Sequence, residues 1–105
     1  MGVHFHVQRR GAPSGELYNV SGRSGWETHW LVGARELGLV IVPHLGDGGT
    51  YVSFPPEDIP QLIAELELLR AWFEGREYDL YLQFIDRIIR VFDETDPAEF
   101  EYGFG

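Results

Sequence analysis

The hydrophobic positions near the start of the chain alternate with polar ones. Apolar residues occupy positions 3, 5 and 7, and polar residues occupy positions 4, 6 and 8. This two-residue period is typical of a strand with one buried face. Turn-forming residues follow at 9–15, and residues 16–20 can return as a second strand. The pattern predicts an N-terminal β-hairpin.

A helical period begins after the glycine- and serine-rich residues 21–25. Ser24 and Glu27 have the spacing of a capping box, in which each side chain binds a backbone N–H near the other. Gly38 favours the left-handed conformation that ends many helices. The apolar residues in between recur at helical spacing and are Trp26, Trp30, Ala34 and Leu37. We therefore expect a helix from Ser24 to Gly38. Core packing is the favoured interpretation for both tryptophans, and a cover over a pocket or a partner is the alternative.

Two strands are predicted after this helix. Residues 39–42, Leu-Val-Ile-Val, are apolar on both faces, which favours a central strand that is covered on both sides. A turn signal at Asp47-Gly48-Gly49 follows. Residues 50–54 then predict a strand that runs antiparallel to residues 39–42.

The strongest helical pattern begins after Asp58, which is a good N-cap because Pro60 then falls in the first turn. A wide apolar stripe continues to Gly75, where this helix is expected to end. A further helix is predicted over residues 78–92, starting near Asp79. Alternation at residues 80, 82 and 84 leaves a strand as the rival interpretation, but the absence of glycine and proline from 76 to 96 favours the helix.

The last residues alternate again, with Phe100, Tyr102 and Phe104 on one side. They predict a short closing strand or a docked arm. The expected order of elements is then ββαββααβ. This order predicts one α+β domain over residues 1–105, with an antiparallel-rich sheet of about five strands and helices packed on it.

The charge of the chain is strongly acidic and unevenly placed. Seventeen acids and eight arginines, with no lysine, give a net charge of −9. Residues 1–56 carry four acids and four arginines, so the whole excess lies in residues 57–105. Such a surface repels nucleic acid and anionic membranes and favours a basic protein partner, and the alternative interpretation is a charged solvated face that maintains solubility. The absence of lysine excludes Schiff-base and P-loop lysine chemistry.

The predicted partner surface lies in this acidic half. Trp72 and Phe73 are adjacent and cannot share one helix face, so one of the two is expected near the surface. An exposed tryptophan beside carboxylates is typical of a protein-binding hot spot. The residues predicted to bind a partner are Glu65, Glu67, Trp72, Glu74, Glu77 and Asp79.

A metal site is the main alternative. His4 and His6 leave the same face of the predicted strand and can place two ring nitrogens on one zinc ion. A third ligand would come from His29, His44 or Asp47. Zinc sites need three or four protein ligands, and nothing in the sequence fixes the distances among these residues. No cofactor is therefore expected by default, and zinc is the alternative.

Two further observations bear on location and assembly. The chain has no cysteine, and its first residues lack the basic and apolar blocks of a signal peptide, which favours a cytoplasmic protein. The aromatic tail or an unpaired sheet edge offers a homodimer interface as a third interpretation. No group of residues has the context of a known catalytic motif, so a binding module is favoured over an enzyme.

Residues 51–66 carry a resemblance to a known class of proteins. Their sequence, Tyr-Val-Ser-Phe-Pro-Pro-Glu-Asp-Ile-Pro-Gln-Leu-Ile-Ala-Glu-Leu, places a Pro-Pro-Glu step between a strand and a leucine-rich acidic helix. This junction, together with the small size and acidity of the chain, resembles the immunity proteins of bacterial polymorphic toxin systems. The resemblance implies an inhibitor that covers the basic active site of a toxin with acidic side chains and performs no chemistry of its own.

Overall fold

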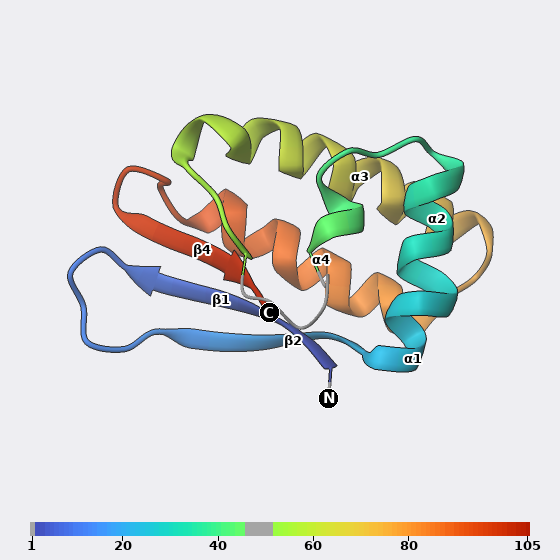
Figure 1. The fold of residues 1–105 in the computed structure, drawn as a ribbon, viewed down its shortest axis with the longest axis horizontal. Helices are drawn as coiled ribbons and strands as arrows, with labels where there is room; N and C mark the ends of the chain where they lie inside the picture. Colours follow the sequence, from blue (N-terminus) through green and yellow to red (C-terminus); the bar gives the residue numbers. More distant parts are fainter. Residues whose placement is uncertain (1, 46–51) are drawn as a thin grey trace.

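Four antiparallel strands form the sheet of the computed structural model, which describes residues 2–45 and 52–105 (Figure 1). Their order is β2-β1-β4-β3. The strands are β1 (Gly2–Arg9), β2 (Glu16–Gly22), β3 (Val52–Ser53) and β4 (Phe100–Phe104). The predicted α+β class is confirmed, and the predicted number of about five strands is too high for the residues that the structure describes.

The N-terminal hairpin forms as the alternation predicts, because β1 pairs antiparallel with β2. Val3, Phe5 and Val7 are buried, and the residues between them are half-buried on the opposite face. β4 pairs with the other edge of β1, so the predicted closing strand lies inside the sheet. Tyr102 and Phe104 are buried in the core, whereas Phe100 is half-buried, with the guanidinium of Arg9 4.7 Å from the centre of its ring.

The helix predicted after β2 is present as three consecutive helical segments. These are α1 (Arg23–Gly25), the π-helical turn η1 (Trp26–Trp30) and α2 (Leu31–Glu36). Trp26 and Trp30 are buried, and their rings stack with centroids 5.5 Å apart. Ser24 does not precede the helix as a cap would, because it already lies inside α1, where its carbonyl oxygen accepts a hydrogen bond from Thr28 Oγ1 (2.8 Å). Gly38 takes the expected left-handed conformation, with φ at 69°.

Residues 39–42 do not form the predicted strand. The backbone N–H groups of Ile41 and Val42 donate to the carboxylate of Glu65 at 2.9 and 3.1 Å, so a side chain accepts the bonds that a neighbouring strand would accept. Val40 is 65% exposed, and the segment is therefore not covered on both sides.

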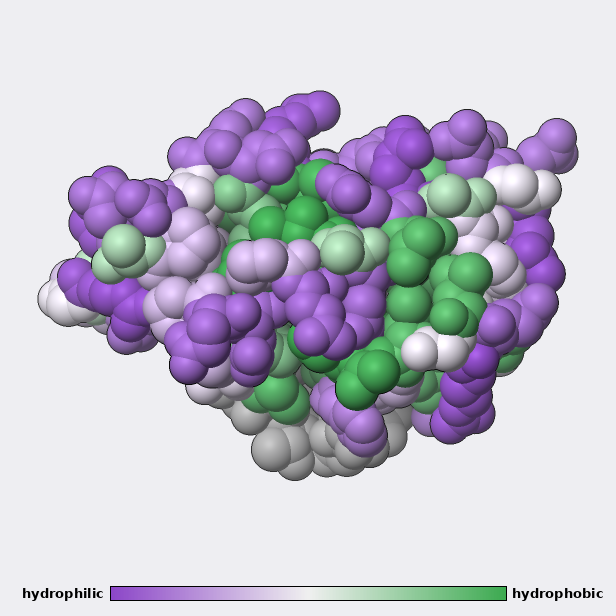
Figure 2. All heavy atoms as spheres, turned by 90° about the horizontal axis from the view of Figure 1, so that it is seen from above, coloured by the Kyte–Doolittle hydropathy of each residue, from purple (hydrophilic) through white to green (hydrophobic). Residues whose placement is uncertain are grey.

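Apolar surface gathers on the right of Figure 2, over the end of the molecule where α2 lies.

The strand predicted at residues 50–54 is present in part. β3 pairs antiparallel with β4, with Val52 opposite Phe104 and Ser53 opposite Gly103. Its partner is therefore β4 and not the segment at 39–42. The turn predicted at positions 47–49 lies outside the described residues.

The two long helices form where the sequence predicts them. They are α3 (Ile59–Gly75) and α4 (Asp79–Glu94), and the short 3-10 helices are η2 (Val42–His44) and η4 (Pro56–Asp58). Asp58 ends η4, and its side chain makes no capping hydrogen bond to α3. Residues 80–84 lie within α4, so the helix interpretation of this segment is confirmed and the strand interpretation is wrong. Arg70 of α3 forms an ion pair with Asp86 of α4 and so joins the two helices.

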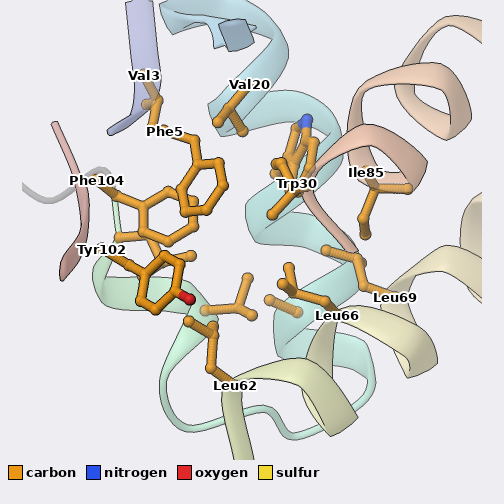
Figure 3. Packing of buried hydrophobic residues seen from close by; sticks show 14 of the residues in the cluster. Val3, Phe5, Val20, Trp30, Leu62, Leu66, Leu69, Ile85, Tyr102 and Phe104 are labelled. Atoms are coloured by element: carbon orange, nitrogen blue, oxygen red, sulfur yellow. The ribbon is translucent and has the colours of Figure 1, made fainter. Parts of the chain in front are cut away.

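The helices cover the face of the sheet that carries Phe5. Figure 3 shows Phe5, Tyr102 and Phe104 of the sheet facing Trp30 and Leu66 of the helical layer. The rings of Phe5 and Phe104 stack with centroids 4.8 Å apart, which fixes β1 against β4 at the centre of the core. None of the helices among the described residues is long and apolar enough to cross a membrane.

Candidate functional site

The outward side of α3 is an exposed acidic and apolar surface. Helix residues three and four positions apart lie on one side. We call this side the α3 outer face, and its exposed residues are Ala64, Glu67, Leu68, Ala71 and Glu74. Leu68 is 54% exposed. Arg70 is the only basic residue of α3, and its guanidinium forms ion pairs with Glu74 (2.8 Å) and with Asp86 of α4. The other carboxylate of the outer face, Glu67, keeps this face acidic.

Two further predicted residues extend the acidic surface beyond α3. Glu77 lies exposed in the connection to α4, in the left-handed conformation with φ at 59°. Asp79 is exposed at the first position of α4, where the partial positive charge of a helix N-terminus favours a carboxylate. Leu80 follows and is 56% exposed. The α3–α4 connection therefore presents carboxylates beside a second exposed leucine.

Trp72 does not stand free on this surface. It is half-buried and meets Phe73 and Tyr78 edge to face, with ring centroids 5.7 and 6.0 Å away. The guanidinium of Arg76 lies 3.9 Å from the centre of the indole ring, and Arg76 also binds Glu36 at 3.3 Å. Trp72 therefore joins α3 to its neighbours, and the exposed apolar side chains of the region are the leucines described above.

Glu65 is not part of this surface. Its side chain is 5% exposed and accepts hydrogen bonds from the N–H groups of Ile41 and Val42 and from Gln61 Nε2 (3.2 Å). The carboxylate thus fastens the segment after α2 to α3. One signal in the sequence points to this role: Glu65 lies one turn before buried Leu69, on a side of the helix where a carboxylate without partners would be costly.

The four histidines do not gather into one site. His4 and His6 are half-buried on the same face of β1, as predicted. His29 packs against two tyrosine rings near the start of α4, with centroids 4.8 and 4.6 Å away, and His44 is exposed in η2. Within residues 2–45 and 52–105, no group of three or more histidine or acidic side chains could hold a metal ion. Asp47, the other candidate ligand, lies outside those residues.

A recess opens on the face of the sheet opposite to the core. Its volume is about 520 Å³, and its lining includes His6, Gln8, Leu17 and Glu101. An imidazole, an amide and a carboxylate around an apolar side chain are typical of a lining that can orient a small molecule. These residues come from three strands whose order only the folded sheet defines, so no local sequence pattern predicts the recess.

We expect the imidazole of His6 to titrate below its usual value of 6.5. Burial lowers the pKa of His6, a hydrogen bond with the backbone of Gly105 raises it, and the charge of His4 lowers it. A lowered pKa means that the folded protein holds His6 in its neutral form at pH values where the unfolded chain already takes up a proton. The contribution of His6 to the free energy of unfolding is therefore highest above pH 6.5 and decreases as the pH falls below that value. NMR titration measures this pKa. The His4→Gln variant should raise it, and a wild-type value at or above 6.5 would contradict the expectation.

Comparison with known proteins found no matching family model, no matching characterised protein and no matching solved structure.

Proposed function

We propose that this protein is a small protein-binding module that binds a basic partner through the α3 outer face, extended by Glu77 and Asp79. The observation that carries the proposal is the 54% exposure of Leu68 between Glu67 and Glu74. A large apolar side chain in solvent beside carboxylates combines two contributions that protein interfaces use, namely burial of apolar area and complementary charge.

The neighbours of Leu68 suit a docking partner. Ala64 and Ala71 lie one helical turn to either side, and both are exposed. Their small side chains leave Leu68 as the most protruding apolar group of the face. Complete burial of one leucine stabilises a complex by roughly 1.5–3 kcal/mol, so this side chain can act as an anchor.

The carboxylates around the anchor would act mainly on the rate of association. The net charge of −9 arises entirely from residues 57–105, which include α3 and α4. A net negative charge of this size attracts a cationic surface before contact, and the attraction weakens as salt is added. We therefore assign affinity chiefly to Leu68 and partner selection chiefly to Glu67, Glu74, Glu77 and Asp79.

Within this class, we propose inhibition of a basic toxin as the specific function. Support comes from the Pro-Pro-Glu junction in residues 51–66, because the helix that follows this junction is α3, which carries the outer face. An active site that binds an anionic substrate is lined with cations, and such a site attracts a carboxylate-bearing helix. Inhibition by occlusion needs no catalytic group on the inhibitor.

The test is partner capture from a bacterial lysate on immobilised protein, followed by Kd measurement with each purified captured protein. The Leu68→Ala variant is expected to weaken binding by about tenfold, mainly through faster dissociation. The Glu67→Lys/Glu74→Lys pair is expected to weaken binding by about tenfold or more, mainly through slower association and with a smaller salt dependence.

The matched control is the Asp93→Lys/Glu99→Lys pair, which changes the net charge equally at two exposed acids outside the α3 outer face. It should alter Kd by no more than about twofold at physiological salt. Equal losses in the two charge pairs would mean that net charge alone attracts the partner. Unchanged affinity in Leu68→Ala and in the outer-face pair would overturn the proposal.

A further inference from the structure

The strand β2 leaves one edge of the sheet open. It is the outermost strand of the order β2-β1-β4-β3, and no strand covers its far edge in the part of the chain that the structure describes. The pairing with β1 is regular from Glu16 to Asn19, and a register shift occurs only beyond that run. Leu17 within the run is 59% exposed. β2 contains neither lysine nor proline, which commonly block pairing at exposed edges.

One side of α4 runs beside this edge in the opposite direction. Phe84 lines a recess with Ser21 and Gly22, near the end of β2. Val91 and Glu94 line another recess with Glu16 and Tyr18, near its beginning. The helix therefore proceeds from the end of β2 toward its beginning. We call this side the α4 flank, and its residues at helical spacing are Leu80, Phe84, Arg87, Val91 and Glu94.

Two opposite charges of the α4 flank lie within electrostatic reach of Tyr18. The hydrogen bond of Tyr18 with Glu16 is the largest cause that raises the pKa of Tyr18, and among the weaker causes Arg87 lowers this pKa and Glu94 raises it. Arg87 and Glu94 are separated by two helical turns, with Val91 between them beside Tyr18. The middle of the β2 edge thus has a cation on one side and an anion on the other.

This arrangement is self-complementary. If two β2 strands pair antiparallel about a twofold axis at Tyr18, Leu17 of one copy lies opposite Asn19 of the other. The same axis places the two α4 flanks side by side and antiparallel. Arg87 of each copy then faces Glu94 of the other copy, so that both charge pairs are attractive.

We propose that two copies of this chain form a homodimer by pairing their β2 edges, with the two α4 flanks packed antiparallel beside them. The paired edges satisfy backbone groups that otherwise face solvent. The partly exposed Val91, which lies beside Tyr18 near the axis, supplies apolar area from both copies. The charge pattern selects a second copy of this chain over a foreign strand, because the exchange of Arg87 and Glu94 by the twofold axis requires an identical partner.

A charge-swap series tests the dimer by sedimentation velocity from micromolar to near-millimolar concentration, with circular dichroism as the check on folding. Wild type is expected to dimerise reversibly. The single variants Arg87→Glu and Glu94→Arg each place like charges opposite each other twice and should raise the dimer Kd by on the order of tenfold. The double variant Arg87→Glu/Glu94→Arg restores opposite charges and should return the Kd to within about threefold of wild type.

Two controls make the result specific. Leu17→Lys places a lysine at the paired edge and should raise the dimer Kd by on the order of tenfold, whereas Glu67→Lys on the α3 outer face should leave it unchanged. A wild type that stays monomeric throughout the range, single swaps without effect, or a double swap with additive losses would overturn the proposal. The Glu67 and Leu68 variants report on the α3 outer face alone, so failure of the dimer and failure of the proposed function are distinguishable.

Discussion

Replacement of Glu65 by alanine is expected to lower the free energy of unfolding by about 3 kcal/mol, because it leaves backbone N–H groups buried without acceptors at roughly 1–3 kcal/mol each. The Glu65 carboxylate accepts both N–H groups, from Ile41 and Val42, and is 5% exposed. Urea unfolding of the purified variant measures the change. A loss of this size should also lower Tm by more than about 10 °C in a domain of this length.

Two companion variants identify the cause of that loss. Glu65→Gln keeps an acceptor oxygen in place and should cost less than the alanine variant, about 1 kcal/mol. Glu67→Ala removes an exposed carboxylate from the same helix and should change stability by no more than about 0.5 kcal/mol. If Glu65→Ala proved as mild as Glu67→Ala, the segment after α2 would not depend on the carboxylate.

Gly33→Val is expected to destabilise the fold by about 2–3 kcal/mol through overpacking between α2 and α3. A Cβ atom at position 33 would lie 2.7 Å from Leu69 Cδ1 and 2.7 Å from Trp72 Cε3. Leu69 is fully buried, and Trp72 is held between Phe73, Tyr78 and Arg76, so neither side chain can retreat freely. Urea unfolding again gives the change in free energy.

The control for this variant uses a helical glycine with free space around it. A Cβ at Gly75 would meet no heavy atom within 4 Å apart from its chain neighbours and the backbone of its own helix. Gly75→Ala should therefore be neutral or stabilise the protein by up to about 1 kcal/mol, because alanine favours helix over glycine. Gly33→Ala should fall between the two, since a smaller clash opposes the same helix preference. Equal behaviour of alanine at positions 33 and 75 would contradict the packing argument.

Periodicity in the sequence predicted most elements of the fold. The alternations at the two ends gave β1 and β4, and the apolar stripes gave α3 and α4. Each of these elements buries one face against the same core, so burial imposes a regular spacing on the sequence. The strand order and the pairing of β3 with β4 depend on contacts between distant segments, which no local period encodes.

The segment at residues 39–42 shows where the pattern fails. Four consecutive apolar residues favour a buried strand, but a short apolar run does not by itself define a backbone conformation. The N–H groups of Ile41 and Val42 bind the carboxylate of Glu65, which lies more than twenty residues away. An acid inside an apolar stripe can therefore serve as an acceptor for distant backbone, and its position among buried leucines is the useful sequence signal.

Some of the predicted partner residues are exposed and others are not, and this difference also depends on contacts between distant segments. Glu67, Glu74, Glu77 and Asp79 are exposed, whereas Glu65 is buried and Trp72 is covered by Arg76. Residue type alone cannot separate these cases, because a carboxylate on a helix faces either solvent or a neighbouring segment. The sequence prediction did not include Leu68, although helical spacing places this residue opposite the apolar stripe that contains Leu66 and Leu69, so periodicity alone accounts for its exposure.

The pairing of Phe5 with Phe104 also has a consequence for the synthesis of the chain. A ribosome releases residue 5 long before residue 104, and until then one edge of β1 has no native partner. Chain closure over so many residues is slow compared with formation of the local hairpin and helices. Until β4 is synthesised, the hairpin of β1 and β2 has an unpaired β1 edge beside Phe5, and such an exposed edge is prone to aggregation. Completion of the sheet is therefore a late event, and chaperones that shield strand edges should act on this chain before residue 104 emerges.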